Sequence, residues 1–293
     1  MPMSLRIPAF VLLGALLVLS ISAAGEDADV RIAGTLSTKA LLTGVVRAMK
    51  EEKDLRVAVD LGPLSTDALD ALAAEKVDLA LVTKPVTGED RAQYPELDFV
   101  TIPIGMEVVA LGISDDLWGA GLRSISKEAM RNIYEQKITN WRQTGGPDEK
   151  IRLFSFEQGQ GVWEIFAEWL YGDNRKAPLP KVEKVRTSDD ARDLLEFTPG
   201  SIVPISASLV DGARCHALGI DLNGRITRPT PEEVAAQTYP MVRPIIAVVI
   251  GRPTLSIRTV TEFLTGPEGQ ALLKKSGGLG LDAVPKPPSD SEY

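Results

Sequence analysis

The stretch that decides the fold runs from residue 133 to residue 170 and reads IYEQKITNWRQTGGPDEKIRLFSFEQGQGVWEIFAEWL. Its apolar residues at 151–154 predict a short buried strand. The polar, glycine-bearing segment 158–161 interrupts this pattern, and apolar residues then recur at helical spacing over 162–170. The stretch therefore predicts a strand, a glycine loop and an amphipathic helix, in that order.

The start of this helix is a candidate ligand site. A helix start presents unpaired N–H groups with the positive end of the helix dipole behind them, which suits an anion or a polar ligand. Glycine permits close approach of a ligand to the backbone. The candidate residues are Gln158, Gly159, Gln160 and Gly161. A glycine loop before a helix is also a common turn, so this pattern alone leaves both interpretations open.

Other residues of the stretch resemble the phosphate-binding proteins of ABC transporters. The resemblance lies in Tyr134-Glu135-Gln136-Lys137-Ile138-Thr139-Asn140-Trp141, Gly145-Gly146-Pro147-Asp148 and Ile151, and near the end of the chain in 266–270 and 277–281. It covers nearly all of the chain after residue 24. The resemblance implies an α/β fold of the type 2 periplasmic-binding-protein kind, with two lobes and a double crossover between them.

The sequence departs from this family in the ligand loop. The family carries an Arg-x-x-Gly-Ser-Gly-Thr loop that holds phosphate, and here Phe156 stands at the Arg, Gln160 at the Ser and Val162 at the Thr. Losing the Arg removes a charge and its hydrogen bonds. We therefore expect phosphate binding to be weaker than in the family, or absent. Backbone N–H groups at helix starts, helped by Lys84, are the alternative means of holding an anion.

The N-terminal part repeats the order of strand, polar loop and helix. Predicted strands at 30–33, 55–61 and 77–82 alternate with helices, which indicates a largely parallel sheet. Ligands of such sheets lie beyond the carboxyl ends of the strands. The hydroxyl residues expected at that edge are Thr35, Ser37, Thr38, Ser65, Thr66 and Thr83. Ser37 or Thr38 can alternatively cap the following helix.

The chain is expected to cross between lobes twice, near 99–113 and again near 239–244. Pro204 lacks an N–H group, so the strand around it is expected at a sheet edge or interrupted. The expected division is lobe I over 25–112 and 238–285, lobe II over 113–237, and a disordered tail over 286–293, where Pro, Ser and charged residues dominate.

Residues 1–24 read as a secretory signal peptide. Arg6 precedes an apolar run, and Ser22-Ala23-Ala24 forms a small-residue cleavage pattern. The run is shorter than the roughly twenty residues that span a bilayer, although a retained anchor is the alternative interpretation. The expected location of the cleaved protein is the periplasm.

Composition limits the chemistry. The formal net charge is −8 without a compensating basic run, so nucleic acid is not an expected partner. Cys215 is the single cysteine and His216 the single histidine. As neighbours in a predicted strand they point to opposite faces, so no Cys–His dyad is expected. Asp115-Asp116 and Asp189-Asp190 are interpreted as helix-start residues. We expect no enzyme activity, no metal site and no cofactor.

These observations favour an exported solute-binding protein that holds phosphate or another small polar ligand or oxyanion between two lobes. It would act as a monomer with an ABC permease in the membrane. The alternative, from a different class, is a non-transport interaction or sensory protein on the same scaffold with little or no small-molecule binding.

Export predicts cleavage after Ala24, because the small residues there follow the apolar run. Intact-mass measurement of the secreted protein should give the mass of residues 25–293. A periplasmic product that still carries residues 1–24 would show that the segment is an anchor.

Overall fold

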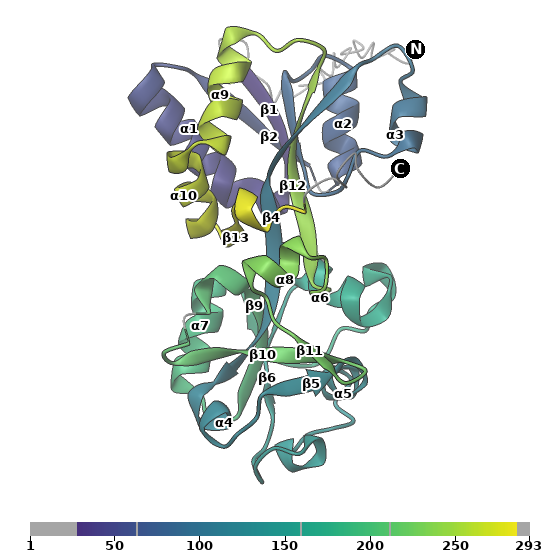
Figure 1. Cartoon of the computed structure of the whole chain (residues 1–293), viewed down its shortest axis with the longest axis vertical. Coiled ribbons are helices and arrows are strands. Elements are labelled where there is room, and N and C mark those ends of the chain that lie inside the picture. Colours follow the sequence, from purple (N-terminus) through teal and green to yellow (C-terminus); the bar gives the residue numbers. More distant parts are fainter. Residues whose placement is uncertain (1–27, 63, 159, 211, 286–293) are drawn as a thin grey trace, which may run out of the picture.

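The computed structural model describes residues 28–285 except Pro63, Gly159 and Asp211. The predicted signal peptide, its cleavage site and the predicted C-terminal tail therefore lie outside the described residues. The described chain forms two lobes joined by two long strands (Figure 1). The expected two-lobed α/β fold is confirmed. In the described part of the chain, no helix combines the length and the apolar character needed to cross a membrane.

The first lobe contains a sheet in which β1, β2 and β3 run parallel, in the order β3-β1-β2. Helices alternate with these strands, as the sequence predicts. Its N-terminal elements are β1 (Val30–Thr35), the 3₁₀ turn η1 (Leu36–Thr38), α1 (Lys39–Lys53), β2 (Val57–Gly62), α2 (Ser65–Ala73), β3 (Leu79–Val82) and α3 (Gly88–Gln93).

Strand β4 (Phe99–Ser114) passes from the first lobe into the second and changes partners on the way (Figure 1). The returning strand β12 (Val242–Ile250) lies antiparallel beside it as far as Val108. From Val109 onward, its partners are strands of the second lobe. This change of partners fixes where one lobe ends and the other begins in the sheet. The division expected at 112 and 238 stays a prediction.

The second lobe is assembled on the far half of β4. Its elements are α4 (Asp115–Gly119), β5 (Ser124–Ser126), α5 (Lys127–Tyr134), η2 (Trp141–Thr144), β6 (Arg152–Leu153), β7 (Ser155–Phe156), α6 (Gly161–Tyr171), η3 (Asn174–Lys176), β8 (Lys184–Val185), α7 (Ser188–Phe197), β9 (Ser201–Ser206), η4 (Ala207–Leu209), β10 (Cys215–Leu222), β11 (Arg225–Thr227) and α8 (Pro231–Ala235). After β12, the chain completes the first lobe with α9 (Leu255–Thr265), α10 (Pro267–Lys275) and β13 (Gly278–Leu279), and η5 (Leu281–Ala283) follows with Ala283 in the core of the second lobe.

Local chemistry explains several of these boundaries. Ser126 caps α5, because its Oγ accepts a hydrogen bond from the Ala129 N–H at 3.2 Å. Thr187 caps α7, with Asp190 completing the capping box. In β9, the neighbouring strand β6 ends opposite Ile202, so Pro204 has only β4 beside it. Pro204 therefore lies at a sheet edge, which is one of the two predicted alternatives, but β9 is not interrupted there, because it pairs with β4 from Ile202 to Ser206.

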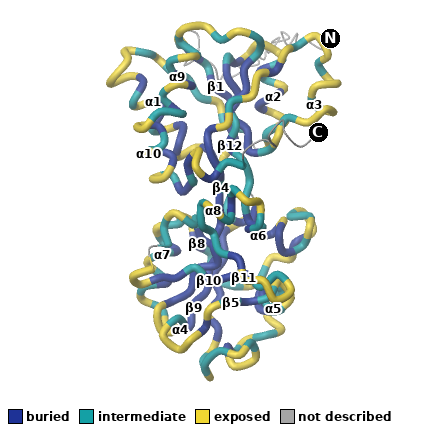
Figure 2. Tube along the Cα trace, in the orientation of Figure 1, coloured by how far each residue is buried: buried dark blue, intermediate teal, exposed yellow. Residues whose placement is uncertain are grey.

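Apolar side chains bury both faces of the first-lobe sheet. One cluster joins the sheet to α1, α9 and α10, and another joins it to α2. In the second lobe, Trp141 donates from Nε1 to the Gly200 carbonyl and Trp163 donates to the Tyr134 hydroxyl, each from a buried position. Figure 2 shows that buried segments follow the strands in both lobes. Each lobe therefore has its own core.

Gly269 tests the packing of α10 on α9. A Cβ at this position would lie 2.0 Å from the Phe263 carbonyl oxygen, which is backbone. Gly269→Ala should therefore lower the free energy of unfolding by about 1–3 kcal/mol or more. Gly88→Ala is the matched control, because nothing lies within 4 Å of its Cβ. The midpoint of urea unfolding should fall for the first variant only. Equal midpoints would contradict this close approach of the helices.

Candidate ligand-binding site

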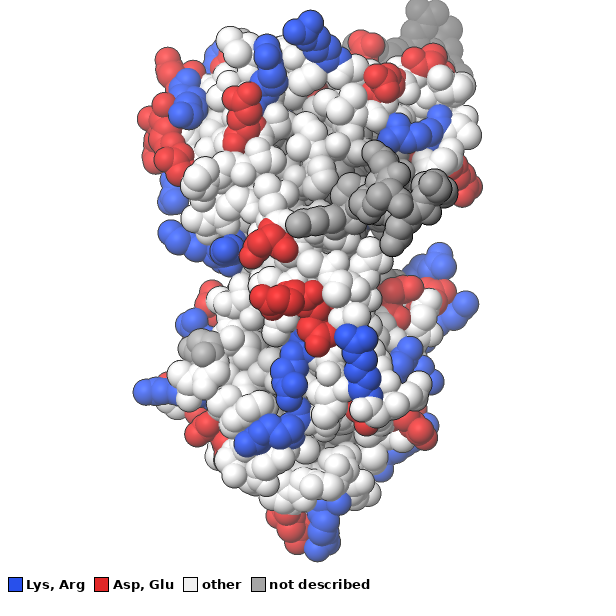
Figure 3. Space-filling model, viewed as in Figure 1, with Lys and Arg blue, Asp and Glu red and all other residues white. Residues whose placement is uncertain are grey.

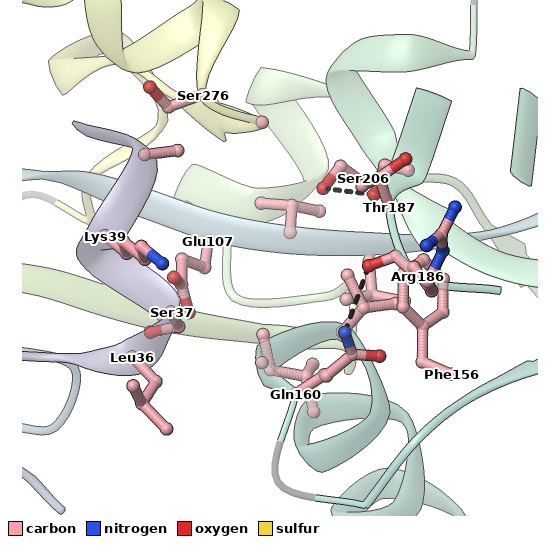
Figure 4. A pocket seen from close by; sticks show the side chains of 18 residues that line it. Leu36, Ser37, Lys39, Glu107, Phe156, Gln160, Arg186, Thr187, Ser206 and Ser276 are labelled. Atoms are coloured by element: carbon pink, nitrogen blue, oxygen red, sulfur yellow. Dashed lines mark hydrogen bonds between the residues drawn. The ribbon is translucent and has the colours of Figure 1, made fainter. Parts of the chain in front are cut away.

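A cavity of about 440 Å³ lies between the lobes where β4 crosses. The first lobe contributes the start of α1 and residues Ser276 and Gly277, and β4 contributes the segment from Glu107 to Val109. The second lobe contributes the loops that precede α6 and α7. Figure 4 shows side chains from these elements facing the cavity from several sides. Both lobes thus form the site.

Two helix starts at this cavity have no side-chain cap. The turn η1 leads directly into α1, and neither Thr35 nor Thr38 caps it through its side chain. Gln160 precedes α6 and makes no capping hydrogen bond. By contrast, α7 is capped, since Thr187 Oγ1 accepts from the Asp190 N–H at 3.0 Å. Uncapped N–H groups and the positive ends of two helix dipoles therefore converge on the cavity from opposite lobes.

Of the residues predicted from the sequence, Ser37, Gln160 and Gly161 line this cavity. Thr35 and Thr38 are buried beside it and support the loop. The Oγ atoms of Thr35 and Ser37 lie 2.9 Å apart, and Thr38 Oγ1 donates to the Thr35 carbonyl at 2.8 Å. Ser37 is the member of this group that faces the cavity.

The side chain of Gln160 holds the glycine loop together. Its Oε1 accepts from the Glu157 N–H at 3.0 Å, and its Nε2 donates to the Arg186 carbonyl at 3.0 Å. Figure 4 shows the second of these hydrogen bonds crossing between the two loops. The amide that we assigned to a ligand from the sequence is thus already engaged with the protein.

The remaining predicted residues lie away from the cavity. Ser65 Oγ accepts from the Thr83 N–H at 3.0 Å, so these two residues join neighbouring elements of the first lobe. Thr66 lines a different, much smaller cavity beside Tyr94. Gln158 is exposed and does not line the interlobe cavity, and Gly159 lies outside the described residues. The hydroxyl residues that we expected at one edge of the sheet therefore lie in two separate places.

Lys84 does not supply the missing cation. Its Nζ lies 2.8 Å from Asp90 Oδ1. Burial raises the pKa of the Asp90 carboxyl, but hydrogen bonds from Lys84 and Thr87 outweigh it and bring the pKa down to about 2. The lysine is therefore committed to this ion pair, and no contact links it to the interlobe cavity.

Two cations in the cavity escaped the sequence analysis. Lys39 follows Ser37 at the start of α1, and Arg186 precedes the cap of α7 (Figure 4). The signal for Arg186 was present, since β8, a polar loop and α7 repeat the same order of strand, loop and helix. Ser188 and Ser206 also line the cavity, with their Oγ atoms 3.3 Å apart.

Arg243 joins the crossing strands to the second lobe. Its Nε donates to Glu107 on β4, and its Nη1 donates to Glu164 on α6 at 2.9 Å. Its Nη2 is buried without a hydrogen-bond partner among the described residues. A Cβ on Gly161 would lie 2.7 Å from this Nη2 and 2.7 Å from Ser37 Cβ. Gly161 is therefore one point at which the two lobes touch.

Other reactive side chains are engaged elsewhere. His216 Nε2 lies 2.8 Å from Asp115 Oδ1, and its ring stacks on Trp118 with centroids 4.7 Å apart. The Cys215 thiol faces the Leu209 carbonyl instead. Over the part of the chain that the structure describes, no cluster of His, Cys, Asp or Glu is arranged to hold a metal ion. The cavity offers hydrogen-bond donors and positive charge, together with the carboxylate of Glu107.

The fold and the cavity are those of a two-lobed solute-binding protein. Residues 22–268 match the family model for a PBP superfamily domain, and the chain belongs to this superfamily. It is 25% identical over 224 residues to the phosphate-binding protein PstS of Bacillus subtilis, which covers 75% of this chain and 70% of that protein.

Solved structures agree on the fold. An ABC-type phosphate transport receptor from Vibrio cholerae matches with a TM-score of 0.65 at 21% identity, over 86% of this chain and 99% of the other. PstS from Borrelia burgdorferi matches with a TM-score of 0.63 at 20% identity, over 86% of this chain and 98% of the other. The resemblance seen in the sequence is confirmed.

Gly161→Val should hold the lobes apart, because its side chain would meet both Ser37 and Arg243 across the contact. We expect a larger radius of gyration by small-angle X-ray scattering, with only a small change in melting temperature. Gly119→Val is the control, since nothing lies within 4 Å of its Cβ. A scattering curve identical to that of the unmodified protein would show that the lobes do not need glycine at this contact.

Proposed function

We propose that this chain is an exported solute-binding protein that holds phosphate or a similar oxyanion between its lobes and delivers it to an ABC permease. The observation that carries the proposal is the interlobe cavity, where two uncapped helix starts and two cations meet. The relatives named as phosphate-binding proteins support the same ligand class.

The positions of the charges explain how an anion could be held without the arginine of the family loop. Phe156 cannot supply a charge, but Lys39 and Arg186 face the cavity from opposite lobes. The carboxylate of Glu107 also lines the cavity and is paired with Arg243. An oxyanion between the lobes would then meet backbone N–H groups and two flexible cations.

Binding between two lobes couples ligand to conformation. A ligand that contacts Ser37 on one lobe and the start of α6 on the other favours the arrangement in which the lobes are close together. A permease can recognise this arrangement, and no bond of the solute has to be broken. We therefore assign the chain to transport and not to catalysis.

The remaining parts of the proposal follow from the sequence. The signal peptide read in residues 1–24 supports export to the periplasm. Acidic and basic side chains occur on both lobes in the view of Figure 3, without a basic area that spans them, which fits a small ligand better than nucleic acid. We propose that the protein acts as a monomer.

A thermal-shift titration with phosphate tests the function. A ligand at a hundred times its dissociation constant should stabilise the fold by about 2.7 kcal/mol. Because Phe156 and Val162 donate no side-chain hydrogen bonds, we expect the shift at millimolar and not at micromolar phosphate. Chloride at equal concentration should give none.

Variants at the cations sharpen this test. Lys39→Gln and Arg186→Gln should each weaken phosphate binding by about tenfold, the effect of losing one charge-assisted hydrogen bond. Lys50→Gln, at the exposed far end of α1, is the matched control and should leave binding unchanged. If phosphate gives no shift at any concentration, the chain is instead a non-transport protein on this scaffold or binds an unrelated solute.

A further inference from the structure

The lobes already touch beside the cavity. Ser37 and Gly161 meet across the gap, and Arg243 on β12 is ion-paired with Glu164 on α6. Further closure at this point would force atoms together, because the space beyond Gly161 is filled by Ser37 and the guanidinium. The cavity of about 440 Å³ therefore persists with the lobes in contact.

Inorganic phosphate is small for this space. The ion has five heavy atoms, and at the roughly 30 Å³ that a water molecule occupies in the liquid, it takes up about as much room as two or three waters. The cavity is several times larger. Its size is within the range of roughly 300–1,000 Å³ that is usual for sites binding small organic molecules.

The extra space has an apolar wall. Phe156, Val162 and Ile165 line it from the second lobe, and Leu36 and Ala40 line it from the first. Figure 4 shows Leu36 and Phe156 on opposite sides of the cavity. Leu36 is 52% exposed and Val162 is half-buried, so both have apolar surface left to cover, whereas Phe156 and Ile165 are buried behind them.

The wall includes the positions at which this chain differs from the family loop. Phe156 stands where the family has Arg, and Val162 stands where it has Thr. Both changes replace hydrogen-bond donors with apolar groups, while the uncapped helix start of α6 between them is kept. The site therefore combines an anion-binding end with an apolar surface that a bare phosphate ion cannot use.

We propose that the ligand is an organic phosphate, a phosphoryl group that carries an apolar substituent. The phosphoryl group binds at the helix starts with Lys39 and Arg186. The substituent packs on the accessible apolar surface of Leu36, Ala40 and Val162. This inference rests on the proposed function, because it uses the same anion-binding end of the cavity.

Isothermal titration calorimetry on the full mature chain distinguishes a site for inorganic phosphate from a site for an organic phosphate. The probes are inorganic phosphate, phenyl phosphate and phenol, each at the same pH and ionic strength. We expect phenyl phosphate to bind at least tenfold more tightly than phosphate, with a more negative heat-capacity change from apolar burial. Phenol, which lacks the anion, should show no binding.

Val162→Thr provides the matched variant, because it changes the wall with little change in shape. It should reduce the preference for phenyl phosphate over phosphate at least threefold. Val100→Thr is the control, since Val100 is exposed on β4 in the first lobe and does not line the cavity. Equal melting temperatures of the two variants would confirm that the comparison concerns binding.

The outcomes are distinct. Phosphate binding as tightly as phenyl phosphate, or more tightly, would overturn this inference and leave the proposed function standing. A preference for phenyl phosphate that Val162→Thr leaves unchanged would also overturn it, because the wall would then not be the cause. Failure of both anions to bind would overturn the proposed function together with the inference.

Discussion

The pairing of β4 with β12 is the constraint on which both lobes depend. These strands carry the chain between the lobes, and β4 exchanges β12 for partners in the second lobe between Val108 and Val109. Any rotation of one lobe against the other has to pass through this exchange, because β4 is the strand that pairs with neighbours in both lobes. Glu107 lies directly before it and lines the cavity. A ligand in this cavity therefore lies close to the pivot, where a small contact can bias a large movement.

The second requirement is a close approach at Gly161. The buried guanidinium of Arg243 is held by carboxylates from β4 and α6, and its remaining nitrogen points at the space next to this glycine. A side chain at position 161 would push Ser37 and Arg243 away, so it would disturb the contact between the lobes even without a ligand. This explains why the glycine frame of the loop survives while its ligand side chains differ: the scaffold and the chemistry of the site depend on different residues.

Local sequence patterns were sufficient to predict the fold. The alternation of strands and helices, the cap at Ser126 and the sheet-edge position of Pro204 all follow from neighbours in sequence. The site depended on pairings that such patterns do not contain. The sequence suggested Lys84 as a cation for the ligand, but Asp90, six residues later, holds it in an ion pair. Lys39 and Arg186 come to the same cavity only through the packing of separate lobes. The amide of Gln160 was likewise engaged by a loop 26 residues away.

The last described segment has a consequence for the order of assembly. Strand β13 pairs with β4 at Glu107 and Met106, Gly277 lines the cavity, and Ala283 is buried in the core of the second lobe. The cavity thus joins residues from the first and the last parts of the chain, with contacts of very long sequence separation. A partly synthesised chain contains the glycine loop and the start of α1 but cannot enclose the cavity. The cavity is consequently complete only once the C-terminal segment has folded against β4.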